Sequence, residues 1–185
     1  MVILIAGATH AGKTALAKKL LARSGIPYFS IDWLKMGLIR SGRTALTPED
    51  DEALVGYLWP VVREMVRTVV ENGQDLILEG CYIPLDWAGA FDEATRAQIR
   101  YVCLVLDEAY IRDNFALIAA QANVAERRLD DSGCTPAALL RDHRETLQQC
   151  RRHGLPFRCV SGDWQAETDA LAADLLRPAP GEFRV

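Results

Sequence analysis

The chain has 185 residues, of which half are hydrophobic and a quarter are charged. This is the composition of a globular protein with enough apolar material for one core, so we expect a single domain over residues 1–185. The formal net charge is −4. This charge argues against a general nucleic-acid binder, which needs an excess of Lys and Arg to displace counterions from phosphates.

Apolar runs and cysteines indicate the expected compartment. No run approaches the roughly 18 apolar residues that a membrane-spanning helix needs. The apolar start of the chain leads directly into a Gly-rich loop, so it is predicted to be a strand and not a secretory leader. The five cysteines form no Cys-x-x-Cys pair, and we expect them to be reduced. These features favour a cytoplasmic protein with neither a membrane nor a nucleic acid as its partner.

Strand-like apolar runs alternate with helical patterns along the chain. Such alternation predicts an α/β protein with a parallel sheet, and the continuous apolar character of the runs indicates that helices cover both faces. The expected strands are residues 2–6, 28–31, 75–78, 100–106 and 157–160.

Proline and glycine mark the expected helix ends. Thr47 followed by Pro48 predicts an N-cap and a first helical residue, with Gly73 as the stop. Thr135 followed by Pro136 predicts a second such start, and Gly154 predicts the end of that helix. A last helix is expected over residues 165–176.

Residues 7–14 match the phosphate-binding pattern G-x-x-x-x-G-K-[ST] between an expected strand and an expected helix. Its glycines let successive N–H groups point at an anion, and the helix that follows adds the positive end of its dipole. An incidental Gly-rich turn is the alternative, but a chance match in a chain of this length and composition is expected only about once in a hundred. The predicted nucleotide-binding residues are Gly7, Thr9, His10, Ala11, Gly12, Lys13, Thr14 and Ala15.

Two side chains of this loop have predicted roles toward ATP. Lys13 is expected to reach the β- and γ-phosphates, and the Thr14 hydroxyl to coordinate Mg²⁺. The tetrapeptide N-K-x-D of most GTPases is absent, and ATPase motors usually carry an apolar strand that ends in a paired Asp-Glu. The strand before Gly80 instead ends in one acid, Glu79, which is expected to hold Mg²⁺ or its water shell. A carboxylate held by loop backbone is the alternative for Glu79.

With this loop, the sequence resembles the small-molecule kinases of the P-loop superfamily, which include adenylate, shikimate and gluconate kinases and chloramphenicol phosphotransferase. Residues 78–84 also resemble the segment after the third strand in 2-phosphoglycerate kinases. The resemblance implies a three-layer fold with strand order 2-3-1-4-5 and a small helical lid at about residues 121–134. It also implies ATP, Mg²⁺ and a small acceptor that carries a hydroxyl or a phosphate.

The resemblance also implies roles for single residues. Asp32, at the end of the second expected strand, corresponds to the carboxylate that accepts the proton of the acceptor hydroxyl, and a helix N-cap is the alternative. Arg127 and Arg128 fall in the expected lid and are predicted to contact the phosphates, with Arg112 as another candidate. A solvated arginine pair, or one bridged to nearby aspartates, is the alternative.

Further residues near the expected strand ends are weaker candidates. Trp33, Tyr82 and Trp87 either line an acceptor pocket or serve in core or rim packing. Residues 161–164 either pass beside adenine or form a plain turn.

The sequence therefore predicts an ATP-dependent phosphotransferase that acts on a small molecule. A nucleotide-sensing module without turnover and a nucleoside monophosphate kinase remain the alternatives.

Overall fold

The computed structural model describes residues 1–125 and 134–177. Over these residues the chain forms a five-stranded parallel sheet in the order β2-β3-β1-β4-β5, which confirms the predicted fold class and strand order. The strands are β1 (Val2–Gly7), β2 (Tyr28–Ser30), β3 (Leu76–Glu79), β4 (Ile99–Leu106) and β5 (Phe157–Val160). Each observed boundary lies within one residue of the predicted one, which is within the usual uncertainty of element ends.

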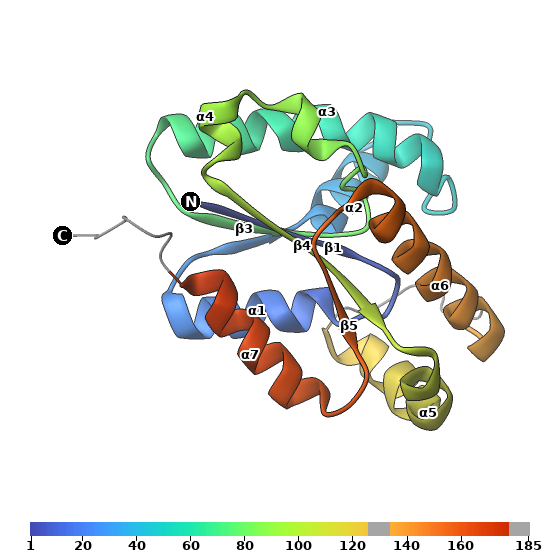
Figure 1. Ribbon diagram of the computed structural model, residues 1–185. Coiled ribbons are helices and arrows are strands. Elements are labelled where there is room, and N and C mark those ends of the chain that lie inside the picture. The colour runs from blue at the N-terminus through green and yellow to red at the C-terminus, as the bar shows by residue number, and fades with distance from the viewer. Residues whose placement is uncertain (126–133, 178–185) are drawn as a thin grey trace.

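Helices cover both faces of this sheet (Figure 1). They are α1 (Lys13–Ser24), α2 (Ile31–Arg40), α3 (Asp51–Glu71), the 3₁₀ turn η1 (Trp87–Ala90), α4 (Glu93–Arg96), α5 (Glu108–Ala125), α6 (Pro136–His153) and α7 (Trp164–Leu176). Alternate residues of β1 pack to opposite sides, so that Leu4 joins the core under α3 and Ile5 joins the core over α1 and α7. The result is a three-layer arrangement around two apolar cores.

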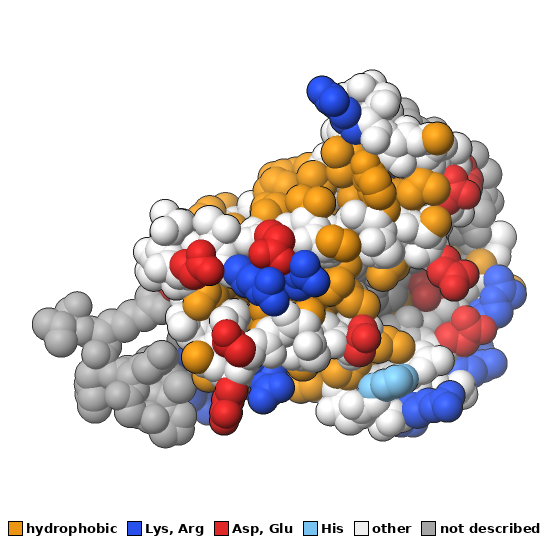
Figure 2. Space-filling view, turned by 90° about the horizontal axis from the view of Figure 1, so that it is seen from above, with side chains coloured by type: hydrophobic (Ala, Val, Ile, Leu, Met, Phe, Trp, Pro, Cys, Tyr) orange, Lys and Arg blue, Asp and Glu red, His pale blue; other side chains and the backbone are white. Residues whose placement is uncertain are grey.

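The outer face on the α3 side carries charges of both signs among hydrophobic side chains (Figure 2). On α3 itself, Glu64 lies 2.8 Å from Arg63 and 3.0 Å from Arg67. No continuous basic stripe appears on this face, in keeping with the acidic net charge. Within the two described stretches of the chain, none of the helices is long and apolar enough to cross a bilayer.

The predicted end of the second strand differs from the observed one by a residue, and the predicted start of α3 was wrong. The predicted second strand includes Ile31, whereas β2 ends at Ser30 and Ile31 begins α2, where its side chain is fully buried against Gly80. The helix expected to begin at Pro48 starts at Asp51 instead. The reason is that the Asp50 carboxylate accepts hydrogen bonds from both the N–H and the hydroxyl of Thr47, at 2.7 and 2.9 Å. Thr47 is therefore held in a turn before the helix and does not cap it.

The predicted ends of α6 were confirmed. Thr135 is the N-cap, and its side chain accepts a hydrogen bond from the N–H of Ala138. Gly154 ends the helix with φ +63°, a left-handed conformation that glycine adopts without steric cost. The start of α6 matters for the site, because this helix packs beside the carboxyl end of β4.

Register brings the predicted site residues to one edge of the sheet. Ile5 of β1 and Ser30 of β2 both pair with Glu79 of β3, and Gly7 of β1 pairs with Leu104 of β4. All these residues lie near the carboxyl ends of parallel strands, where ligands of open α/β sheets bind.

Candidate active site

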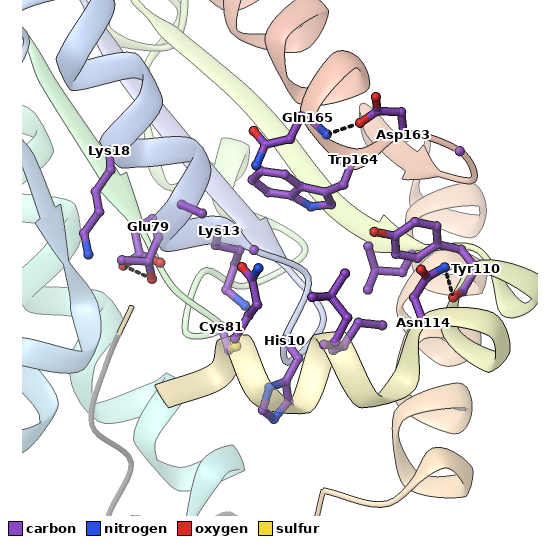
Figure 3. Close-up of a pocket in the computed structure, with 18 of the residues that line it drawn as sticks. His10, Lys13, Lys18, Glu79, Cys81, Tyr110, Asn114, Asp163, Trp164 and Gln165 are labelled. Atoms are coloured by element: carbon purple, nitrogen blue, oxygen red, sulfur yellow. Dashed lines mark hydrogen bonds between the residues drawn. The ribbon is translucent and has the colours of Figure 1, made fainter. Parts of the chain in front are cut away.

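A cavity of about 530 Å³ lies at this edge, between the phosphate-binding loop, α5 and the segment after β5 (Figure 3). Its volume falls in the range of small-molecule sites. Tyr110 and Asn114 lie at one side of the view and Glu79 and Lys18 at the other, with Trp164 and Lys13 between them. The lining residues are His10, Gly12, Lys13, Thr14, Ala15, Lys18, Asp32, Glu79, Cys81, Leu106, Tyr110, Asn114, Leu117, Ile118, Gln121, Gly162, Asp163, Trp164 and Gln165.

The two glycines of the loop are required by close packing. At Gly7, which has φ +141°, a Cβ atom would lie 2.1 Å from the carbonyl oxygen of Leu104. At Gly12, which has φ +90°, it would lie 2.6 Å from the ring of Trp164. Neither distance is possible between non-bonded atoms, so the motif glycines allow the loop to lie directly against β4 and the start of α7.

Lys13 is the buried cation of the loop. Its side chain is folded back, and Nζ donates to the carbonyl oxygens of Ala8 at 2.8 Å and Gly7 at 3.2 Å. Burial lowers the pKa of this ammonium, but the nearby Cys81 and Glu79 outweigh burial, so that the pKa lies above its ordinary value. Lys13 therefore stays protonated and offers a positive charge to an anion.

The first turn of α1 adds an anion-binding element directly after the loop. Gly12 occupies the N-cap position in a left-handed conformation, and α1 begins at Lys13 with no acidic side chain in its first turn. The N–H groups at a helix start have no intrahelical partner, and the helix dipole places partial positive charge there. Loop, lysine and helix start together give this end of the cavity groups that attract an anion, and we call it the phosphate end.

Thr14 and Glu79 meet beside this phosphate end. The Thr14 hydroxyl donates to Oε1 of Glu79 at 3.1 Å, and Glu79 is only 1% exposed. Mg²⁺ prefers oxygen ligands and keeps several waters, so in phosphoryl-transfer sites one or two protein oxygens and the substrate phosphates suffice. The described residues contain no cluster of three or more His, Cys, Asp or Glu side chains around a potential metal. A hydroxyl beside one buried carboxylate nevertheless fits the oxygen chemistry of a Mg²⁺ site in this setting.

Asp32 lines the same cavity, but from a different element than expected. It is the second residue of α2 and lies in its first turn, so it neither ends β2 nor caps the helix, because Ser30 holds the N-cap position. Both predictions of its local structure were therefore wrong. Its carboxylate Oδ1 lies 2.8 Å from Nζ of Lys35, one turn later on α2.

A chain of polar contacts extends from Asp32 to α3. Lys35 donates to the hydroxyl of Tyr82 at 2.7 Å, and that hydroxyl donates to Oδ1 of Asp51 at 3.1 Å. Burial and the charges of Asp32 and Asp51 raise the pKa of Tyr82, so it remains a neutral hydroxyl. We call Asp32, Lys35, Tyr82 and Asp51 the acceptor end, of which Asp32 alone lines the cavity.

Aromatic residues considered for an acceptor pocket do not line the cavity. Trp33 is half exposed and packs against Tyr28, whereas Trp87 is buried and stacks on Tyr101 with ring centroids 5.2 Å apart. Tyr82 is buried behind Asp32. Trp33 and Trp87 therefore serve in rim and core packing, whereas the hydroxyl of Tyr82 contacts Lys35.

The opposite end of the cavity is built from α5 and the segment after β5. Tyr110, Asn114 and Ile118 follow one another at four-residue spacing and therefore share a face of α5. Trp164 lies across from them, and its indole N–H donates to the carbonyl oxygen of Ala11 in the loop.

The segment that contains Trp164 is held rigidly. Asp163 caps α7 by accepting from the N–H groups of Gln165 and Ala166, while Oε1 of Glu167 accepts from those of Ser161 and Gly162. Sequence analysis identified residues 161–164 but missed the α5 face, although polar residues at helical spacing after β4 were a signal that could have found it.

None of the arginine candidates is among the described residues that line the cavity. Arg127 and Arg128, and most of the expected lid at 121–134, lie outside the part of the chain that the structure describes. Arg112 lies on α5, is absent from the cavity lining, and pairs with Glu108 at 3.3 Å with its own side chain 61% exposed. For Arg112 the structure therefore favours the solvated alternative.

Two residues of α6 that sequence analysis did not consider contact the loop. Asp142 accepts a hydrogen bond from the N–H of Thr9 at 2.8 Å, and Nε2 of His143 lies 2.8 Å from the Thr9 carbonyl oxygen. His143 is only 1% exposed. No pattern in the sequence signals these contacts, because Thr9 and His143 are 134 positions apart.

Comparison with known proteins shows a likeness of fold. No protein-family model and no curated protein sequence matches the chain. Solved structures do match over nearly its whole length. A presumed kinase from Chloroflexus aurantiacus J-10-fl is similar with a TM-score of 0.59 and 19% identity, covering 94% of this chain and 95% of that one.

Two further solved structures are similar at lower identity. The deoxyadenosine kinase of M. mycoides gives a TM-score of 0.53 and 13% identity, with 95% of this chain and 98% of that one covered. A shikimate kinase from Bacteroides thetaiotaomicron gives 0.51 and 13%, with 95% of both chains covered. At such identities the likeness shows the fold and not the substrate. The chain thus has the fold of the P-loop small-molecule kinases, and the resemblance predicted from its phosphate-binding loop is confirmed at that level.

Proposed function

We propose that this protein is an ATP-dependent kinase that transfers the γ-phosphoryl group to a hydroxyl of a small molecule. The observation that carries the proposal is that a single cavity is lined by the phosphate-binding loop, the Thr14–Glu79 pair and Asp32. Phosphoryl transfer depends mainly on positioning and charge stabilisation, and these three groups supply both.

At the phosphate end, the chain's own groups neutralise charge. The N–H groups at the start of α1 face the β- and γ-phosphates, and Lys13 exchanges its contacts with the Ala8 and Gly7 carbonyls for phosphate oxygens. Thr14 and Glu79 would hold Mg²⁺, which would supply charge neutralisation at the phosphate oxygens. Together these groups stabilise the negative charge that develops as the bond between the γ-phosphorus and the leaving oxygen breaks.

At the acceptor end, Asp32 takes the proton. The acceptor oxygen forms a bond to the γ-phosphorus, its proton passes to the Asp32 carboxylate, and ADP leaves with the bridging oxygen. Lys35 holds this carboxylate from the side of α2 at 2.8 Å. Arg127 and Arg128 remain our candidates for cations that close over the phosphates.

The end of the cavity that is formed by α5 and the segment after β5 binds the adenosine part of ATP. The ring of Trp164, the apolar side chains of Leu117 and Ile118 and the polar groups of Tyr110 and Asn114 together offer stacking surface and hydrogen-bond partners.

A screen of a metabolite library for acceptor-dependent ADP release tests this proposal. The wild-type protein is incubated with ATP and Mg²⁺, with acceptor-free and EDTA-treated reactions as controls. We expect at least one hydroxylated small molecule to raise ADP release well above both controls. Tight Mg²⁺-ATP binding with no acceptor-dependent release from a broad library would favour the nucleotide-sensing alternative. Transfer to nucleoside monophosphates alone would favour the nucleotide kinase alternative.

A further inference from the structure

The strongest unexplained feature is a contact between α6 and a single residue of the phosphate-binding loop. Both backbone polar groups of Thr9 are held by consecutive residues of α6, its N–H by Asp142 and its carbonyl by His143. His143 also accepts a hydrogen bond through Nδ1 from the N–H of Leu106, at the end of β4, at 2.8 Å. One buried imidazole thus connects α6, β4 and the loop.

These contacts determine the tautomer of His143. The Leu106 N–H is a donor, so Nδ1 must be unprotonated, and the Thr9 carbonyl is an acceptor, so Nε2 must carry the proton. A neutral imidazole satisfies both partners, and an imidazolium would lose the bond from Leu106. Burial lowers the pKa of His143 to about 4, which keeps the ring neutral near pH 7.

The contacts also orient two successive peptide groups of the loop. Peptide bonds in the described residues are trans, so the N–H and C=O of one peptide group point to opposite sides. With the Thr9 N–H held by Asp142, the Ala8 carbonyl points away from α6, and it accepts from Lys13 at 2.8 Å. With the Thr9 carbonyl held by His143, the His10 N–H likewise points away from α6.

This orientation is not the default for the chain. His10 has φ +60°, a left-handed conformation that non-glycine residues rarely adopt and that costs of order 1 kcal/mol. Such a conformation persists only when surrounding contacts hold it, and the contacts from α6 to Thr9 lie immediately before it.

We propose that His143 and Asp142 are positioning residues that hold the Thr9 peptide groups so that the loop presents its N–H donors to the nucleotide phosphates. This role rests on the proposed function, because it assumes that the loop binds a nucleotide triphosphate. The ligand contacts belong to the loop, and the two α6 side chains act only through it. Their loss should therefore weaken the binding of phosphates and leave the binding of the nucleoside part unchanged.

Paired substitutions separate the hydrogen bonds from the packing of α6. His143→Leu removes both bonds of the imidazole and keeps an apolar side chain in the core, whereas His143→Gln retains a donor and an acceptor. Asp142→Ala and Asp142→Asn form the second pair, because Asn keeps one accepting oxygen for the Thr9 N–H. Leu139→Ala is the control for lost packing, since Leu139 is buried one turn earlier on α6, in the same apolar core as Ala11 of the loop, and its side chain forms no hydrogen bond.

Calorimetric titrations use three probes: the Mg²⁺ complex of adenylyl imidodiphosphate, inorganic tripolyphosphate and adenosine. We expect His143→Leu and Asp142→Ala to weaken the first two by a similar factor, roughly 10- to 100-fold, as when one hydrogen bond to a charged group is lost. Adenosine binding should not change. Gln and Asn should restore affinity to within about threefold, and Leu139→Ala should lower Tm without changing any of the three affinities.

Several outcomes would overturn this role. Equal affinity for tripolyphosphate in the wild type and in folded His143→Leu would show that the contact only packs α6. A nitrogen NMR spectrum of the wild type with the proton on Nδ1 of His143 would contradict the geometry itself. Absence of phosphate binding in the wild type would defeat the proposed function together with this role, whereas unchanged binding in the variants would defeat this role alone.

Discussion

The phosphate end and the acceptor end of the cavity are built in different ways. The phosphate end is formed largely by consecutive residues, 7–14, and by their backbone, with only a few side chains reaching in from elsewhere. The acceptor end is formed by side chains of α2, of α3 and of the segment after β3, and only Asp32 of these lines the cavity. A backbone site needs glycines at fixed spacing and leaves a motif, whereas a side-chain site leaves none.

Because the two ends are built differently, we expect one to bind the nucleotide phosphates and the other to recognise the acceptor. Phosphates are common to all nucleotide-dependent kinases, so a backbone cradle for them is independent of the acceptor. Acceptor recognition depends on side chains that different packing can replace. Substitutions at the acceptor end should therefore alter transfer and leave ATP binding intact, and those at the phosphate end should alter ATP binding itself.

Asp32→Asn should have the largest effect on transfer. The substitution keeps the size of the side chain and one accepting oxygen toward Lys35, but it removes the carboxylate that we propose as the acceptor of the proton. Positioned general bases contribute roughly 10²–10⁴ in rate, so we expect a loss of that order in single-turnover transfer at saturating ATP. Asp92→Asn is the control, because Asp92 caps α4 and does not line the cavity. Transfer by Asp32→Asn above a third of the wild-type rate would make Asp32 structural and would direct the search for the base to Glu79.

Lys13→Ala tests the phosphate end directly. Removing one partner of a buried, hydrogen-bonded charge pair costs about 2–5 kcal/mol, so binding of a Mg²⁺-ATP analogue should weaken by roughly 30- to 5,000-fold. Titration calorimetry measures the change. Arg23→Ala, which removes an exposed cation from the far end of α1, should bind as the wild type does. If the folded Lys13→Ala variant keeps wild-type affinity, residues 7–14 do not form a phosphate-binding site.

Predictability from the sequence follows the same division. The loop was predictable because its motif is local, and the strand order was predicted from the family resemblance that this motif carries. The acceptor end was only partly predictable. Asp32 was identified, but its partners Tyr82 and Asp51 lie 50 and 19 positions further along the chain, and no spacing rule connects them.

Local patterns also failed where two short-range signals competed. Thr47 and Asp50 are both good N-caps, and the side chain of Asp50 bonds back to Thr47 and delays the helix. His143 could not be assigned from the sequence, because a lone histidine within an amphipathic helix looks the same whether it faces solvent or a loop. Its role depends on the position of β4 next to α6, which only the fold determines.

The lowered pKa of His143 predicts that the free energy of unfolding of the protein depends on pH. Its pKa is about 4 in the folded protein and about 6.5 in an unfolded chain, so the unfolded chain binds the proton more readily. The stability it contributes is complete above pH 6.5 and is lost as the pH falls toward 4, at about 1.4 kcal/mol per pH unit. His143→Gln should lack this component.

Denaturant unfolding at pH 7.5 and 4.5 measures this component. The wild type should lose about 2 kcal/mol more than His143→Gln between the two values. His153→Gln, which replaces an exposed histidine at the end of the same helix, should behave as the wild type does. Parallel losses in all three proteins would mean that His143 titrates normally and is not held between Leu106 and Thr9.

Tyr82→Phe should have the smallest effect and tests whether the acceptor end works as a connected unit. The substitution removes the hydroxyl that accepts from Lys35 and donates to Asp51, and it leaves the Lys35–Asp32 ion pair in place. Loss of this link should let Lys35 and Asp32 sample other orientations, so transfer should fall by roughly 3- to 10-fold, which corresponds to about one hydrogen bond. Affinity for the Mg²⁺-ATP analogue should not change, because the hydroxyl does not reach the loop.

Tyr101→Phe is the matched control, since Tyr101 is also buried but stacks on Trp87 away from the cavity. An unchanged transfer rate in Tyr82→Phe would restrict the acceptor end to Asp32 and Lys35, whereas a weakened nucleotide affinity would mean that the two ends are coupled and that the division between them does not hold.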